Sequence, residues 1–288
     1  MELRVVLMLL AGAVVSCAWN LLSKRSVDKQ AFLWLCLAVL SVGFFVPFVL
    51  VFTSFSRTGW MIALASGVVE AVYFLLLGSA YQYGDLSLVY PLARGSAPVF
   101  VTVIARVVLG ERVSVSGLLG IVAVVAGIYA LHLRSFDRQN LLAPLLSLRE
   151  KSSRLALLTG VTISVYMLID KVGVQYVPPI QYAYLIFLIP TILLAPYMLS
   201  AKRKALVREW QANKLIALLA AVMFVISYST VLIAMTTSKV SYVSSVRETS
   251  VVFAALAGTF ILREPFGEKK IMGSLLIFFG IALIGLSR

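Results

Sequence analysis

Ten apolar runs, each about long enough to cross a lipid bilayer as a helix, follow one another along this sequence. A crossing requires about 20 apolar residues, because a helix rises about 1.5 Å per residue through a hydrocarbon core about 30 Å thick. The runs cover residues 4–23, 31–52, 60–82, 86–108, 113–132, 155–172, 179–200, 214–236, 241–262 and 267–287. This pattern predicts an all-α polytopic membrane protein with ten transmembrane helices.

The composition excludes the main soluble classes of protein. Hydrophobic residues make up 61% of the chain and charged residues only 13%, about half of the usual charged fraction of about 25%. A soluble globule could not cover its surface with so few charges, so a soluble enzyme, a disordered chain and a secreted disulfide scaffold are excluded. Two cysteines and one histidine are too few for a usual zinc site, and we expect no metal, no cofactor and no enzymatic activity.

The two halves of the chain repeat each other. Adding 153 to the residue numbers of segment 83–131 places Arg94 on Arg247 and aligns glutamates and glycines as well. These further pairs are Glu111 with Glu264, Gly120 with Gly273 and Gly127 with Gly280. Because five spans are an odd number, the second copy enters the membrane from the opposite side, as in many secondary transporters. We therefore expect two inverted five-helix repeats, at 1–132 and 155–288, joined by a cytoplasmic or interfacial connector at 133–154.

The net charge of +13 is distributed unevenly over the loops. Of the 25 Lys and Arg residues, 16 lie in the loops after odd-numbered spans or at the adjoining span ends, seven lie in or beside the other loops and at the termini, and two lie deep inside spans. Basic residues near span ends mark the cytoplasmic face of a membrane protein. The charge therefore predicts an inner-membrane protein with both termini outside and its basic face against anionic lipid. It does not indicate nucleic acid as a partner.

Two segments resemble the EamA-type family of the drug/metabolite transporter superfamily. Each has a Glu-containing turn followed by a span with spaced glycines, and they read VVLGERVSVSGLLGIVAVVAGIYAL and FILREPFGEKKIMGSLLIFFGIALIGL. The resemblance implies ten helices, alternating access, and a central cavity lined mainly by spans three, four, eight and nine, with help from one and six. Members move amino acids and other small metabolites, often outward. Many members have basic loops after spans two and six, where this chain has only Arg57 and Lys171. Either the chain belongs to a subset with swapped orientation, or the orientation assigned above is reversed.

Four charged residues lie inside the predicted spans and are the first candidates for substrate binding: Glu70, Arg94, Arg247 and Glu248. Each costs about 2.5–3.5 kcal/mol at a helix centre on insertion scales, so such residues indicate function by default. Two symmetry-related guanidinium groups would suit a carboxylate or phosphate; alternatively, each Arg pairs with a carboxylate and stabilises packing. Glu70 is a candidate for proton coupling or amine recognition, because burial disfavours its charged form. The alternative is a structural ion pair with Arg94.

Polar and aromatic residues in the same spans extend the candidate site. They are Trp19, Asn20, Tyr73, Tyr90, Ser96, Tyr166, Tyr228 and Thr249. The spaced glycines predict close packing of spans five and ten, or a face that binds a second copy of the chain. Glu111 and Glu264 are interpreted as structural caps at the starts of those two spans, where a carboxylate suits the positive helix end.

These observations favour a secondary transporter that moves a small polar or amphipathic metabolite, such as an amino acid, out of the cell. The alternative is a flippase for a lipid-linked anionic substrate, with arginines at the headgroup level. The expected partners are the small-molecule substrate and membrane lipid, with a homodimer as the alternative use of the glycine face.

Overall fold

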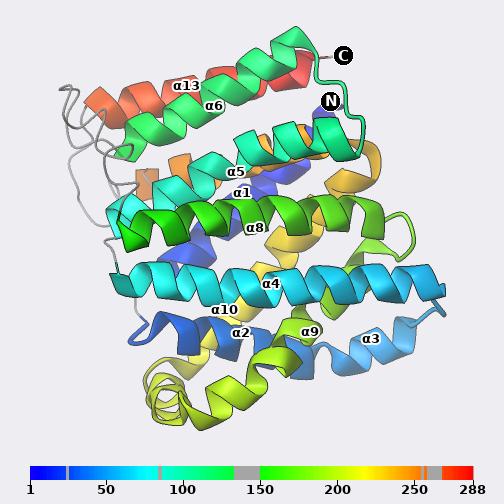
Figure 1. Cartoon of the computed structure of the whole chain (residues 1–288), viewed down its shortest axis with the longest axis vertical. Coiled ribbons are helices and arrows are strands. Elements are labelled where there is room, and N and C mark those ends of the chain that lie inside the picture. The colour runs from blue at the N-terminus through cyan, green and yellow to red at the C-terminus, as the bar shows by residue number, and fades with distance from the viewer. Residues whose placement is uncertain (24–25, 84–85, 133–149, 254–255, 258–267, 288) are drawn as a thin grey trace.

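The computed structural model is built from α-helices throughout the residues that it describes (Figure 1). It describes residues 1–23, 26–83, 86–132, 150–253, 256–257 and 268–287, with the backbone alone at 81–82, 86–88, 90–91, 132 and 268–270. The bounded helices within this part are α1 (Leu3–Ser23), α2 (Lys29–Gly43), α3 (Phe45–Val51), α4 (Arg57–Tyr83), α5 (Leu86–Val108), α6 (Val115–His132), α8 (Lys151–Gly173), α9 (Pro179–Ser200), α10 (Arg203–Thr237), α11 (Val240–Arg247) and α13 (Glu268–Leu286).

The helix bounds lie close to the predicted spans. Of the described helices, five are long and apolar enough to cross a membrane, or six if α2 and α3 are taken as one bent span. α6 and α13 contain shorter apolar stretches, at Val115–Leu131 and Ile271–Leu286. The all-helical membrane architecture is therefore confirmed, and the number of ten spans stays a prediction.

Two of the predicted spans are bent or broken, and a further break lies just before a third. α2 and α3 meet at an angle of 44°, because Pro47 lacks an amide N–H and its ring crowds the carbonyl group of Gly43. α10 has non-helical backbone at Asn213, next to the residue where the sequence predicts span eight to begin. α11 ends at Arg247, and a tight turn at Glu248 precedes further helix from residue 250. This last break lies in a span that the sequence presents as continuous.

Helices of each half of the chain pack against helices of the other half. α4, which is the third predicted span, packs against α8 and α9 of the second half, and α10, its counterpart, packs against α1 and α2 of the first. Two further pairs, α5 with α11 and α6 with α13, join equivalent helices across the halves. The contacts of α4 and α10 are thus related by the repeat, which fits two copies of one unit around a pseudo-twofold axis.

The glycine stripes of α6 and α13 face each other inside the chain. A Cβ atom at Gly120 would lie 2.6 Å from the carbonyl oxygen of Gly280, and one at Gly127 would lie 2.6 Å from that of Gly273. The residue numbers rise along one helix as they fall along the other, so the two helices are antiparallel. Packing of the fifth and tenth predicted spans is confirmed, and the glycine stripe is used within the chain.

Replacement of Gly127 by valine is expected to lower the free energy of unfolding by about 1–3 kcal/mol, the usual range for overpacking. The added side chain meets backbone atoms of α13, which cannot rotate away. Gly285→Ala in α13 is the matched control, because a Cβ atom there meets nothing within 4 Å. Thermal unfolding in detergent measures both variants, and an equal loss in the two would contradict this account of α6–α13 packing.

Both chain termini lie at one end of the helix bundle. The N-terminal amino group of Met1 donates a hydrogen bond to the carbonyl oxygen of Ser287 at 3.0 Å. In Figure 1 the ends of α1, α4 and α6 and the starts of α2 and α8 lie at the opposite, left-hand side. The sequence places most of the basic loops at that side. The helix α8 begins at Lys151, so the last four residues of the connector predicted at 133–154 are helical, and its first 17 lie outside the described residues.

At the basic end, acidic side chains cap the start of α2. Glu209 of α10 accepts hydrogen bonds from the backbone N–H groups of Val27, at 2.8 Å, and Asp28, at 3.0 Å. Asp28 accepts in turn from the N–H of Ala31 and pairs with Lys202 at 2.9 Å. Burial alone would raise the pKa of Asp28, but the hydrogen bonds from Lys202 and Ala31 outweigh it and hold this pKa below 3.8. This end of α2 is therefore tied to the second half of the chain.

At the end with the termini, Glu111 caps a helix of the other half, which corrects the sequence interpretation. The sequence assigns Glu111 to the start of the span that follows it. In the structure its carboxylate accepts from the N–H of Val240 at 2.8 Å and from the hydroxyl of Ser241 at 2.8 Å, at the start of α11. The chain turns just before Glu111, where Gly110 has a φ of 66°, so the carboxylate serves a neighbouring helix rather than its own. Glu264, the repeat mate, lies outside the described residues.

Candidate functional site

A cluster of buried and half-buried charged and tyrosine side chains lies where α4, α5, α8, α10 and α11 meet. Most members come from the residues that the sequence singled out. They are Glu70 and Tyr73 of α4, Arg94 of α5, Tyr166 of α8, Tyr228 of α10, and Arg247 and Glu248 at the end of α11. The Tyr73 phenol lies within electrostatic range of all four charged members. We refer to this set as the central cluster.

Arg94 forms an ion pair with Glu248. Its Nη1 atom donates to Oε1 of Glu248 at 3.4 Å, and both side chains are buried, with exposed fractions of 9% and 3%. This pairing with a carboxylate is the structural alternative that the sequence left open for each arginine. It crosses between the halves, because α5 belongs to the first repeat and α11 to the second.

Arg247 has different surroundings. Its guanidinium carbon lies 5.2 Å from the centroid of the Tyr228 ring, and Nη1 lies 3.9 Å from the sulfur of Met167. Within the described part of the chain, no carboxylate lies at salt-bridge distance from this guanidinium. A cation over an aromatic face gains about 0.5–2 kcal/mol, less than the cost of burying a charge without its counter-ion. A guanidinium in these surroundings can bind an anionic group.

Glu70 is also buried, and one of its carboxylate oxygens has no donor among the described residues. Its exposed fraction is 4%, and its Oε2 atom accepts no hydrogen bond from the described residues. No ion pair between Glu70 and Arg94 is found among those residues, so the structural pair considered from the sequence is not present there. The charged groups nearest in electrostatic terms are Asp170 and Arg247. A buried carboxyl oxygen without a donor is one that can bind an ammonium group or keep a proton.

Aromatic rings extend from the central cluster toward α1. The contacts run in sequence from Tyr73 to Tyr166, Tyr228, Phe187, Phe224 and Trp19, with ring centroids between 5.0 and 6.4 Å apart. Trp19 thus reaches the cluster through intervening rings, whereas Tyr166 and Tyr228 belong to it directly. Aromatic walls of this kind suit an apolar or aromatic group of a ligand.

Three of the remaining predicted residues form their hydrogen bonds within their own segments rather than with the central cluster. Asn20 donates to the carbonyl oxygen of Ser16, one turn earlier in α1. The hydroxyl groups of Ser96 and Thr249 likewise bond to carbonyl oxygens of their own turns. The side chain of Tyr90 lies outside the described residues.

Asp170 of α8 is a functional candidate that the sequence interpretation missed. It is fully buried, with an exposed fraction of 0%. Three hydroxyl groups donate to its carboxylate: Ser66 at 2.5 Å, Tyr182 at 3.0 Å and Tyr228 at 2.5 Å. Its position beside Lys171 at the predicted end of a span resembles an ordinary interfacial charge. The available signal was helical spacing, because Asp170 is four residues from Tyr166 and shares its face.

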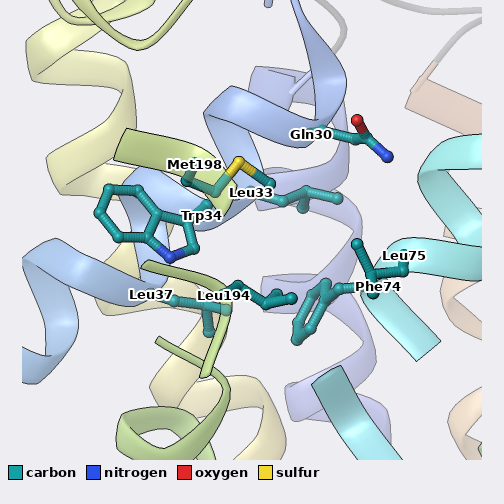
Figure 2. A pocket seen from close by; sticks show the side chains of 8 residues that line it. All are labelled: Gln30, Leu33, Trp34, Leu37, Phe74, Leu75, Leu194 and Met198. Carbon is teal, nitrogen blue, oxygen red and sulfur yellow. The ribbon is translucent and has the colours of Figure 1, made fainter. Parts of the chain in front are cut away.

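Two hollows accompany this arrangement. Figure 2 shows an apolar crevice of about 10 Å³ between α2, α4 and α9, lined by side chains such as Trp34, Phe74 and Leu194. It has room for about one water molecule and is not a substrate site. A larger hollow of about 520 Å³ lies at the end with the termini, where Tyr242 of α11 and Lys239, just before this helix, meet both chain ends. It opens at the start of the helix whose other end carries Arg247.

Charged side chains buried between two interlocking helical halves define the class of polytopic membrane transporters. The sequence pattern of the EamA-like transporter family matches residues 3–133 and again residues 152–286. The chain therefore belongs to the EamA-like transporter family. Comparison with curated proteins gave no match. One solved crystal structure superposes with a TM-score of 0.78 over 99% of this chain and 98% of its own, at 15% sequence identity, which shows the shared fold.

Proposed function

We propose that this chain is a secondary transporter of a small zwitterionic metabolite with an apolar or aromatic side chain. The observation that carries the proposal is the pair formed by Arg247, whose guanidinium has no carboxylate at salt-bridge distance in the described chain, and Glu70, whose Oε2 accepts no hydrogen bond there. A guanidinium binds a carboxylate through a planar fork of donors. A carboxylate binds an ammonium group, and the tyrosines beside both residues bind the apolar part.

The larger hollow is the approach to this site that we propose. α11 begins beside it, and Tyr242 lines it. Arg247 follows five residues later, about 7.5 Å further along the helix axis. Helices of the two halves carry the two ends of the site, since Glu70 lies in α4 and Arg247 ends α11. Relative movement of the halves would then close the hollow and open the site at the basic end, which is alternating access.

The distribution of basic residues supports an orientation in the inner membrane with both termini outside. The hollow then faces outward, and the substrate leaves the cell through it. A reporter that is active only in the cytoplasm, fused to the C-terminus, tests the orientation. Strong reporter activity would show that the C-terminus is in the cytoplasm and that the proposed orientation is wrong.

Transport in proteoliposomes tests the function. The panel contains phenylalanine and leucine, together with phenethylamine, which lacks the carboxylate of phenylalanine, and 3-phenylpropionate, which lacks its ammonium group. We expect counterflow of the labelled amino acids at least tenfold faster than of either single-charge analogue. Equal rates for phenylalanine and the acid would remove Glu70 from the site. No flux of any panel compound, together with scrambling of a polyprenyl-phosphate lipid, would favour the flippase.

A further inference from the structure

Among the described residues, Asp170 accepts more hydrogen bonds than either carboxylate of the central cluster, Glu70 or Glu248. Its Oδ1 atom accepts from Ser66 and Tyr182, and its Oδ2 atom accepts from Tyr228. These donors stand on three helices other than its own, namely α4, α9 and α10. Four helices from both halves therefore meet at one carboxylate, and the substrate groups proposed above do not include it.

We propose that Asp170 is the proton-coupling carboxylate of this transporter, loaded with a proton when the donor from the other half withdraws and emptied when all three hydroxyl donors close around it. This inference rests on the proposed function, because it assigns the coupling of the same transport cycle. Hydrogen bonds from O–H groups favour the ionised carboxylate, and their loss favours the neutral acid. In the release step, the O–H bond of the carboxylic acid breaks, the electron pair stays on the carboxylate oxygen, and the proton passes to water.

The donor set makes this exchange depend on conformation. Ser66 stands on α4 of the first half, whereas Tyr182 and Tyr228 stand on α9 and α10 of the second. Asp170 itself stands on α8 of the second half, so a movement that separates the halves draws Ser66 away and leaves the carboxylate with two of its three donors. The Arg247 guanidinium lies over the ring of Tyr228. Tyr228 therefore links Asp170, which would carry the proton, to Arg247, which would bind the substrate.

The position of Asp170 gives the proton a short path to one side. Asp170 is three residues from the end of α8 at Gly173, and Tyr182 is in the first turn of α9. The short segment between these helices lies at the same end as the termini (Figure 1). Gly173 packs directly on the Tyr182 ring, where a Cβ atom would overlap it. A small opening of this segment would expose the carboxylate at that end without opening the substrate site.

Other titratable and charged groups share this region and bear on the same pH dependence. They are Glu70 and Tyr73 of α4, Arg94 of α5, Tyr166 and Lys171 of α8, Tyr182 of α9, Tyr228 of α10, and Arg247 and Glu248 of α11. Among them, Glu70 is the carboxyl group in electrostatic range of Asp170. It differs in having no hydrogen-bond donor on Oε2, which is why the coupling is assigned to Asp170 and the ammonium group to Glu70.

Proteoliposomes with an entrapped pH-sensitive dye test the assignment. Phenylalanine is the probe, and its counterflow and the proton movement it induces are measured on one preparation. We expect Asp170→Asn to reduce proton movement at least tenfold while counterflow stays within about twofold of wild type. Glu70→Gln is the comparison variant, expected to reduce counterflow and proton movement together. An Asp170→Asn protein that still moves protons overturns the assignment, and so does one in which both activities fall in equal proportion, as a structural role would require.

A second variant keeps the carboxylate and removes one donor. Tyr182→Phe is expected to move the midpoint of pH-dependent proton movement upward by about one pH unit, because one hydrogen bond to the charged form is lost. An unchanged midpoint overturns the assignment even if Asp170→Asn fails to fold. Wild-type protein that shows no counterflow of any panel compound overturns the proposed transport function itself, and this outcome is distinct from the two above.

Discussion

Arg247→Gln is expected to weaken substrate binding about 100-fold while leaving the stability of the protein unchanged or slightly higher. In the described chain no carboxylate lies at salt-bridge distance from this guanidinium, so the substitution strands no counter-ion. Removal of one partner from a buried, hydrogen-bonded charge pair costs about 2–5 kcal/mol. Because the partner here is the substrate carboxylate, the cost appears as a loss of free energy of substrate binding. The half-saturating phenylalanine concentration for counterflow measures the loss of binding, and thermal unfolding in detergent measures stability.

Arg106→Gln is the matched control, since Arg106 is exposed in the last turn of α5. This substitution removes the same charge at a position away from the site. It should change neither quantity. Arg247→Lys keeps the charge without the planar fork of donors and should recover only part of the affinity. If Arg247→Gln instead unfolds at a much lower temperature with unchanged affinity, the guanidinium is a structural element and the substrate carboxylate binds elsewhere.

Much of the fold follows from the sequence because membrane insertion acts on runs of residues rather than on single contacts. α5 and α9 begin and end where the apolar runs do, at 86–108 and 179–200. The packing of Gly127 on α13 was also predictable, since glycine stripes allow close approach of helices. The break after Arg247 was not, because nothing in the surrounding apolar run distinguishes a tight turn from continuing helix.

The candidate site could be predicted only in part, because the orientation of each helix about its own axis decides which charged side chains pair. The offset of 153 makes Arg94 and Arg247 symmetry mates, yet Arg94 pairs with Glu248, the residue next to its mate. Two guanidinium groups near a common axis repel each other, and an acidic neighbour placed after one of them neutralises the other. Asp170 escaped notice for a similar reason, because its three hydroxyl donors come from helices distant in sequence.

Arg94→Met is expected to destabilise the folded protein by about 3–5 kcal/mol, a larger loss than any other single substitution considered above. Breaking a buried ion pair by removing one partner leaves an uncompensated charge, and this cost exceeds the net value of the pair. The stranded group is Glu248, with an exposed fraction of 3% and a second oxygen that already accepts no hydrogen bond within the described chain. The midpoint of unfolding in a denaturing detergent measures the loss.

The double replacement Arg94→Met with Glu248→Gln separates charge from packing. If the unpaired carboxylate causes the loss, the double variant should recover most of the stability, because a well-packed neutral pair is often as stable as the ions it replaces. Glu248→Gln alone leaves the Arg94 charge without this carboxylate and should be destabilised by a similar amount. A double variant as unstable as Arg94→Met would show that the Arg94 side chain stabilises the fold through packing instead. The joining of the two halves would then rest on their interlocked helices, with the ion pair free to break during transport.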